Sequence, residues 1–183
     1  MKNKKLVILL TLIFNSIIIA QDTNDKTINI SGNIGQVSPL TSADRSDYSA
    51  GLAFGLNLSF PKKTIQIFKH DFQMGAELNF SNLESNQTND DNFKLNSLIF
   101  QLHTAFNKLP VDFSFGFGIS DVTIKGIAGS GILDIMHKLP NDKLDISIGL
   151  RLQQVFDINK NYKIEHLHGL YGINIKVGKP ITF

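Results

Sequence analysis

Large apolar residues recur at every second position along most of this chain, and this alternation restricts what the chain can fold into. The clearest short example is DFSFGFGIS, residues 112–120, where four large residues alternate with four small ones: Phe113, Phe115, Phe117 and Ile119 against Ser114, Gly116, Gly118 and Ser120. A period of two predicts a β-strand with its large side chains on one face. In a soluble sheet the opposite face usually carries charged residues. Here that face carries small residues, and Asp112 at the start of the stretch is its one charged residue.

The same alternation occurs in eight segments, so the chain is predicted to be all-β. They cover residues 27–35, 48–60, 71–81, 93–106, 112–120, 126–138, 143–156 and 167–183. The weakest is 126–138, because Ile132 and Met136 fall on the same face as Asp134. No amphipathic helical pattern competes with these strands. An even number of strands favours antiparallel closure, and the prediction is an eight-stranded up-and-down barrel.

The connections between these segments alternate in length. Long polar loops are expected at residues 36–47, 82–92 and 157–166, and shorter links around residues 61–63, 107–110 and 139–142. The link near residues 120–125 is a short exception. If both termini lie on one side of a membrane, the long loops lie on the other side. Short turns on one side and longer loops on the other are typical of transmembrane barrels.

The composition of the small face decides which face of the barrel is outside. A soluble lipocalin-like carrier would turn its apolar face inward around a ligand, and its outer face would carry many charged residues. The small face instead carries mainly glycine, serine and asparagine, for example Gly51, Gly55, Gly75 and Gly149. Small side chains suit the crowded interior of an eight-stranded barrel. We therefore predict that the apolar face contacts lipid and that the barrel is transmembrane.

The N-terminal residues have the pattern of a cleaved secretory signal. Lys2, Lys4 and Lys5 form a basic region, residues 6–20 are mostly apolar, and Ala20 stands at the expected cleavage position. The apolar run is short for a membrane-spanning helix. The expected organisation is a signal peptide at residues 1–20 and a barrel domain at residues 21–183, placed in the outer membrane.

The C-terminal stretch INIKVGKPITF ends on an aromatic residue, with Ile181 on the same strand face as Phe183. With the signal, the eight strands and the alternating loops, it resembles small bacterial outer-membrane barrels. The richness in Asn, Lys and Ile and the AQD junction at residues 20–22 look like the outer-membrane-protein β-barrel family of the Bacteroidota. The resemblance implies that Phe183 and Ile181 are read by the barrel-assembly machinery. Lys179 and Pro180 depart from the pattern, since the first is usually apolar and proline suits only a strand end or edge.

A few charged residues fall on the predicted inward face. They are Glu77, Asp145, Arg151 and Lys176. The third and seventh strands of an eight-stranded barrel stand opposite each other, so Glu77 and Arg151 should meet across the lumen. We predict a polar network that fills the lumen.

Other kinds of chemistry find little support in the sequence. His103, His166 and Ser130 show no spacing that indicates a catalytic triad, and His166 with His168 is a pattern that solvated histidines commonly show. We predict no catalytic residues, no metal site and no cofactor. Eighteen basic and sixteen acidic residues leave almost no net field to attract nucleic acid, and no nucleic-acid partner is expected.

Three functional hypotheses follow. The first is a structural or surface-recognition barrel without catalytic activity, which presents the long loops 36–47, 82–92 and 157–166 to envelope partners. The second is an accessory barrel of an envelope-assembly or protein-secretion complex. The third is a narrow solute channel or a soluble lipocalin-like carrier.

Overall fold

The computed structural model describes residues 27–67, 70–86, 92–105, 110–122, 126–141, 143–156 and 169–182. Its strands are β1 (Thr27–Pro39), β2 (Gly51–Ile67), β3 (His70–Leu83), β4 (Phe93–Ala105), β5 (Val111–Val122), β6 (Gly126–Leu139), β7 (Asp145–Phe156) and β8 (Gly169–Thr182). A short helix, α2 (Ser42–Asp47), lies between β1 and β2. Among the described residues, no helix is long and apolar enough to cross a membrane.

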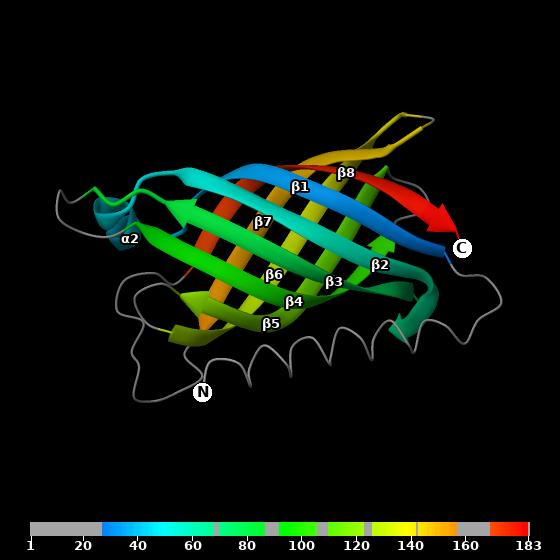
Figure 1. The fold of residues 1–183 in the computed structure, drawn as a ribbon, viewed down its shortest axis with the longest axis horizontal. Coiled ribbons are helices and arrows are strands. Elements are labelled where there is room, and N and C mark those ends of the chain that lie inside the picture. The colour runs from blue at the N-terminus through cyan, green and yellow to red at the C-terminus, as the bar shows by residue number, and fades with distance from the viewer. Residues whose placement is uncertain are drawn as a thin grey trace.

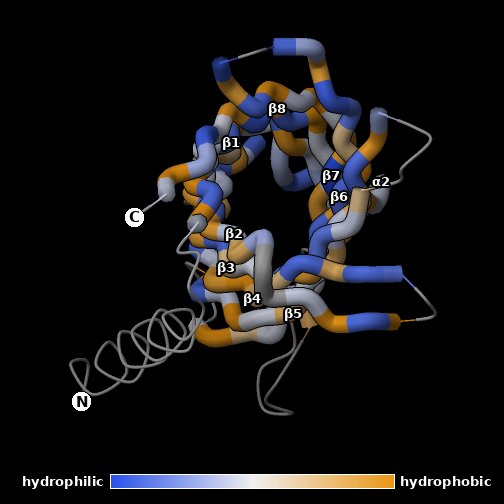
Figure 2. Tube along the Cα trace, turned by 90° about the vertical axis from the view of Figure 1, so that its right-hand side faces the viewer, coloured by the Kyte–Doolittle hydropathy of each residue, from blue (hydrophilic) through white to orange (hydrophobic). Residues whose placement is uncertain are grey.

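The eight strands form one closed antiparallel barrel in sequence order (Figures 1 and 2). Each strand pairs with its neighbour in sequence, and β1 closes the ring against β8 from Thr27–Thr182 to Pro39–Leu170. The predicted fold class is therefore confirmed. We call the end of the barrel where β1 begins and β8 ends the terminus end. The opposite end, which carries α2, is the loop end.

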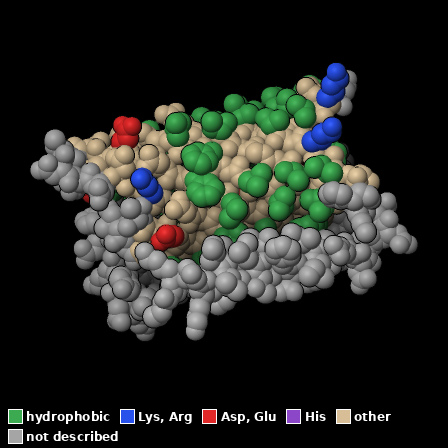
Figure 3. Space-filling view, viewed as in Figure 1, with side chains coloured by type: hydrophobic (Ala, Val, Ile, Leu, Met, Phe, Trp, Pro, Cys, Tyr) green, Lys and Arg blue, Asp and Glu red, His purple; other side chains and the backbone are tan. Residues whose placement is uncertain are grey.

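The outer wall of the barrel is apolar, as the alternation predicts. Figure 3 shows apolar side chains spread over the wall, with the charged side chains of this face nearer its two ends. Large side chains exposed on the strands include Ile34, Leu52, Phe54, Leu56, Phe80, Phe100, Phe117, Ile119, Ile135, Leu150, Leu152, Ile173 and Ile175. Figure 2 shows the alternation of polar and apolar positions along the strands.

The interior changes in chemistry along the barrel axis. At the loop end, buried apolar residues from all eight strands and from Tyr48 pack into one cluster: Val37, Tyr48, Ala53, Leu83, Phe93, Leu95, Val122, Ala128, Val155 and Leu170. Below this cluster most of the buried side chains are polar, and they include Asn57, Glu77, Asn79, Gln101, Asp134, Arg151 and Gln153. Ile99, Ile132 and Met136 are also buried there, but the apolar cluster itself lies at the loop end.

Two predicted connections are corrected by the structure. Residues 61–63 were expected to link the second and third strands, but they lie within β2, where the register jumps from Phe60–Met74 to Thr64–Gln73. Pro61 has no N–H to give to the ladder, which is consistent with its place in a bulge. The predicted loop 36–47 is also shorter than expected, because β1 continues to Pro39 and residues 42–47 form α2.

Candidate functional site: a charged cluster inside the barrel

Three buried charged residues meet in the middle of the lumen. Glu77 on β3, Asp134 on β6 and Arg151 on β7 are 1%, 5% and 5% exposed. Arg151 binds both carboxylates: its Nη1 and Nη2 donate to the two oxygens of Glu77, the Nη2 bond measuring 2.8 Å, while Nε and Nη2 donate to Asp134, both at 2.7 Å. We call these three residues the charged plug.

The remaining lone pairs of Glu77 are also occupied. Gln101 Nε2 donates to Oε2 at 2.5 Å, and the side-chain amides of Asn33 and Asn57 donate to Oε1 and Oε2 at 3.2 and 3.4 Å. These donors come from β4, β1 and β2. A buried carboxylate is costly unless its oxygens are satisfied, and here donors from four other strands, β1, β2, β4 and β7, satisfy Glu77.

A second, uncharged layer lies between the charged plug and the apolar cluster. Gln153 is its centre: the side-chain oxygen accepts from Asn79 Nδ2 at 3.1 Å, and Nε2 donates to Ser97 and Ser130 at 2.9 and 3.0 Å. Ser97 is in turn 2.7 Å from Ser120. This layer ties β3, β4, β5, β6 and β7 together across the lumen.

The two other residues predicted for the network lie toward the terminus end. One guanidinium against two carboxylates leaves the charged plug with one net negative charge. Lys176 stands beside Asn33 in the β1–β8 ladder and lines the adjoining cavity, so its ammonium group compensates this charge from a distance. Within the described part of the chain it forms no direct ion pair. Asp145 is exposed at the start of β7 and does not touch the charged plug.

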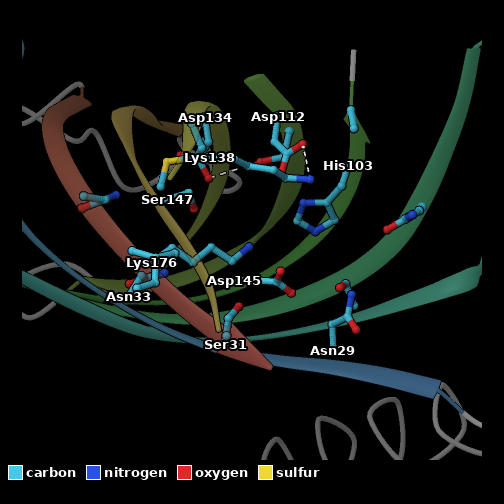
Figure 4. A pocket seen from close by; sticks show the side chains of 18 of the residues that line it. Asn29, Ser31, Asn33, His103, Asp112, Asp134, Lys138, Asp145, Ser147 and Lys176 are labelled. Carbon is cyan, nitrogen blue, oxygen red and sulfur yellow. Dashed lines mark hydrogen bonds and ion pairs between the residues drawn. The ribbon is translucent and has the colours of Figure 1, made fainter. Parts of the chain in front are cut away.

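A polar cavity of about 220 Å³ opens at the terminus end (Figure 4). Asp112 and Lys138 form an ion pair of 3.1 Å at its wall, and Lys176, Asp145 and His103 project toward the same space. Arg151 and Asp134 line the cavity as well, so the charged plug is where the cavity ends inside the barrel. The cavity reaches the plug from one end and does not continue to the loop end.

The loop end is covered by residues 45–49 and 84–86, which we call the cap. Asn86 joins its two halves, because its side-chain amide and backbone N–H donate to the carbonyl oxygens of residues 45, 46 and 47 at 2.9–3.2 Å. The Arg45 guanidinium lies 5.5 Å from the centre of the Tyr171 ring. Tyr48 packs edge-on against Phe93 of the apolar cluster, with ring centres 5.6 Å apart. Parts of two predicted long loops thus form an ordered surface.

The residues considered for catalysis or metal binding do not come together. Ser130 lies in the Gln153 layer, near the start of β6, whereas His103 lies at the terminus-end cavity, near the end of β4. In the described ranges, no three histidine or carboxylate side chains are grouped so as to hold a metal ion. His166, His168, Phe183, the predicted signal and the predicted loop 157–166 lie outside the described residues. Ile181 is exposed on the outer face of β8.

Sequence reasoning missed Asp134 as a member of the charged plug. Asp134 shares its strand face with Ile132 and Met136. Because two large apolar residues on one face indicate the outer wall, the sequence pattern does not show that this face points into the lumen. All three side chains are buried in the lumen. Asp134 could have been found by pairing the sixth predicted strand with the seventh, because it stands directly opposite Arg151 in the β6–β7 ladder.

The closed ring of eight antiparallel strands, apolar outside and polar inside, has the architecture of small outer-membrane barrels. Among solved structures, the chain is similar to the outer membrane enzyme PagL, with 14% identity and a TM-score of 0.50 over 84% of this chain and 99% of that one. It is also similar to Neisserial surface protein A, with 14% identity and a TM-score of 0.42 over 86% of this chain and 96% of that one. No family model matches the chain, and no curated protein matches it in sequence.

Proposed function

We propose that this protein is an integral outer-membrane β-barrel of structural or surface-recognition type, with a closed lumen and no catalytic activity. The observation that carries the proposal is the combination of an apolar outer wall with a hydrogen-bonded polar interior. Soluble proteins rarely expose such a continuous apolar surface. A bilayer would cover it, because a closed barrel leaves no unpaired strand edge in the hydrocarbon.

The charged plug argues against the hypothesis of a solute channel. A solute entering from the terminus end meets Arg151, which is held by four hydrogen bonds to two carboxylates, Asp134 on the adjacent strand β6 and Glu77 on the opposite strand β3. Beyond it lie the Gln153 layer and then the apolar cluster. Passage would require all three to separate, and an eight-stranded barrel has room for little more than its own side chains.

The cap supports the surface-recognition part of the proposal. Hydrogen bonds from Asn86 hold parts of the predicted loops 36–47 and 82–92 together in one conformation. A preformed surface loses less conformational entropy on binding than a mobile loop does. The proposed partners are therefore envelope or external proteins that contact the loop end, in addition to outer-membrane lipid and the assembly machinery during biogenesis.

Two finer points remain within the proposal. We propose membership of a Bacteroidota-type barrel family on the richness of the chain in Asn, Lys and Ile and on the AQD junction at residues 20–22. The second candidate function is the accessory barrel of an assembly or secretion complex, and co-purification of stoichiometric partners from solubilised membranes would favour it over a barrel that acts alone.

Location and closure can be tested together. The full chain is expressed in a Gram-negative host, the membranes are separated by density, and the purified barrel is recorded in planar bilayers. The expected results are sedimentation with outer membranes and negligible conductance. The triple variant E77A/D134A/R151A should also stay closed, because the Gln153 layer and the apolar cluster still block the lumen, and so should D112A/K138A, which removes the ion pair at the cavity wall. A soluble wild-type protein or a stable open wild-type pore would refute the proposal.

A further inference from the structure

The cavity at the terminus end has a wall built from all eight strands. Uncharged polar side chains form the largest group in this wall, among them Asn29, Ser31, Ser59, Gln73 and Ser147. The inner end of the cavity stops at the charged plug, and the outer end is open. The cavity is therefore a polar recess with one entrance.

Three neighbouring side chains of this wall have unused hydrogen-bonding groups. Lys176 stands opposite Ser147 in the β7–β8 ladder and opposite Asn33 in the β1–β8 ladder, and Ser31 is the next inward residue of β1. Lys176, Ser31 and Ser147 project toward the same space (Figure 4). Within the described ranges these three side chains have no hydrogen-bond partner, although Ser31 and Ser147 are only 7% and 8% exposed. Buried polar groups usually have a partner, so water or a ligand must supply it.

The charges around the recess disfavour an ionic ligand. A carboxylate bound to Lys176 would also approach Glu77 and Asp134, the two carboxylates with the strongest electrostatic effect on this lysine. A cation would face Lys176 and the Arg151 guanidinium, which both line the recess. Because like charges repel more strongly inside a protein than in water, the recess favours a neutral molecule.

We infer that the terminus-end cavity binds a small neutral molecule that carries several hydroxyl groups and is about the size of one sugar ring. A hydroxyl group both donates and accepts, so such a molecule can accept from Lys176 and exchange hydrogen bonds with Ser31 and Ser147. The cavity volume of about 220 Å³ lies below the roughly 300–1,000 Å³ of pockets for drug-sized ligands. The charged plug blocks the inner end, so the ligand is held and not passed on. The proposed membrane location determines only which side of the membrane supplies it.

The test compares sugars that share one ring but differ in charge. The isotope-labelled full-length barrel is refolded in dodecylphosphocholine micelles, which contain no sugar head group, and binding is followed by NMR chemical shifts. The neutral probes are glucose, galactose, mannose and inositol, and the charged probes are glucuronate and glucosamine. At least one neutral probe should give saturable shifts at the amides of Ser31, Ser147 and Lys176. The two charged probes should bind more weakly than the neutral one.

Two variants and one matched control locate the binding. K176M removes the ammonium donor and should raise the dissociation constant roughly ten- to a hundredfold, the usual effect of losing a hydrogen bond to a charged group. S147A removes one neutral hydroxyl and should raise it roughly two- to tenfold, which keeps the test valid if K176M does not fold. The control is K143M, because Lys143 is exposed and does not line the cavity. It should bind like the wild type.

Each contrary result overturns the inference in a different way. If no neutral probe gives saturable shifts at millimolar concentration, the recess holds water only. If glucuronate or glucosamine binds as tightly as the neutral sugar, the recess selects charge or does not discriminate. If K176M and S147A bind like K143M, the sugar binds elsewhere. Because binding is measured in micelles, none of these results bears on the proposed membrane location, which the fractionation experiment tests separately.

Discussion

Replacing Arg151 with methionine should be among the most destabilising single changes in the lumen. The variant keeps an unbranched side chain about as long as arginine up to Nε but removes the four hydrogen bonds to Glu77 and Asp134. Two carboxylates, 1% and 5% exposed, are then left facing each other without a cation. Breaking a buried ion pair by removing one partner costs about 3–5 kcal/mol, and we expect R151M to lie in that range.

The companion substitutions define the network. E77Q should cost less, about 1–3 kcal/mol, because Arg151 keeps its two bonds to Asp134 while the donors around position 77 lose a charged acceptor. The double variant E77Q/R151M still leaves Asp134 buried and unpaired. Only the triple variant E77Q/D134N/R151M removes all three charges, and it should recover part of the stability lost in R151M.

The assay is urea unfolding in lipid vesicles, followed by far-UV circular dichroism and by the heat-dependent gel mobility of folded barrels. The matched control is K138M, which breaks the 3.1 Å ion pair to Asp112. Because that pair is half-exposed, the loss should be at most about 1 kcal/mol. The reasoning predicts a coupling energy of about 1–3 kcal/mol between positions 77 and 151. Strict additivity of E77Q and R151M, or equal losses in R151M and K138M, would refute it.

Four further changes test other parts of the barrel. L56R places a charge on the apolar outer wall. If position 56 lies near the bilayer midplane, the free energy of unfolding in vesicles should fall by about 2–4 kcal/mol. G118A should impair folding, since the added Cβ would stand 1.9 Å from the Leu98 carbonyl oxygen, and the folded fraction after refolding measures this. N86A should loosen the cap and expose it to added protease without changing the melting temperature of the barrel. Removal of Phe183 should lower the yield of assembled barrel in cells more than refolding into detergent.

The sequence predicts the architecture well because one physical rule governs it. Alternation at a period of two assigns each residue to one face, and the small size of the opposite face decides which side meets lipid. The strands then follow in order, since antiparallel neighbours need only short connections. The alternation does not predict where a strand bends without ending. Pro61 therefore suggests a turn between two strands, although it lies in a bulge within β2.

The interior is less accessible to sequence reasoning. Strand order alone indicates that Glu77 and Arg151 stand on opposite strands, and the structure brings them together. Exact axial position is not contained in the alternation, so Asp145 could be placed on the inward face but not at the exposed end of β7. The glycines show the same limit. Gly116 reads as a position that would accept serine, yet an added Cβ there would stand 2.4 Å from the Phe100 carbonyl oxygen.

The placement of the charged plug links it to closure of the ring. Glu77 on β3 and Arg151 on β7 are separated by half of the barrel, so they approach only when β1 and β8 have come together. In an open sheet Arg151 would retain Asp134, its neighbour in the β6–β7 ladder, but Glu77 would have amide partners alone. In an open sheet that carboxylate would face water, and closure buries it at the point where Arg151 can pair with it. The Glu77–Arg151 contact therefore forms only in the closed barrel, and a change that removes Arg151 should penalise closure itself.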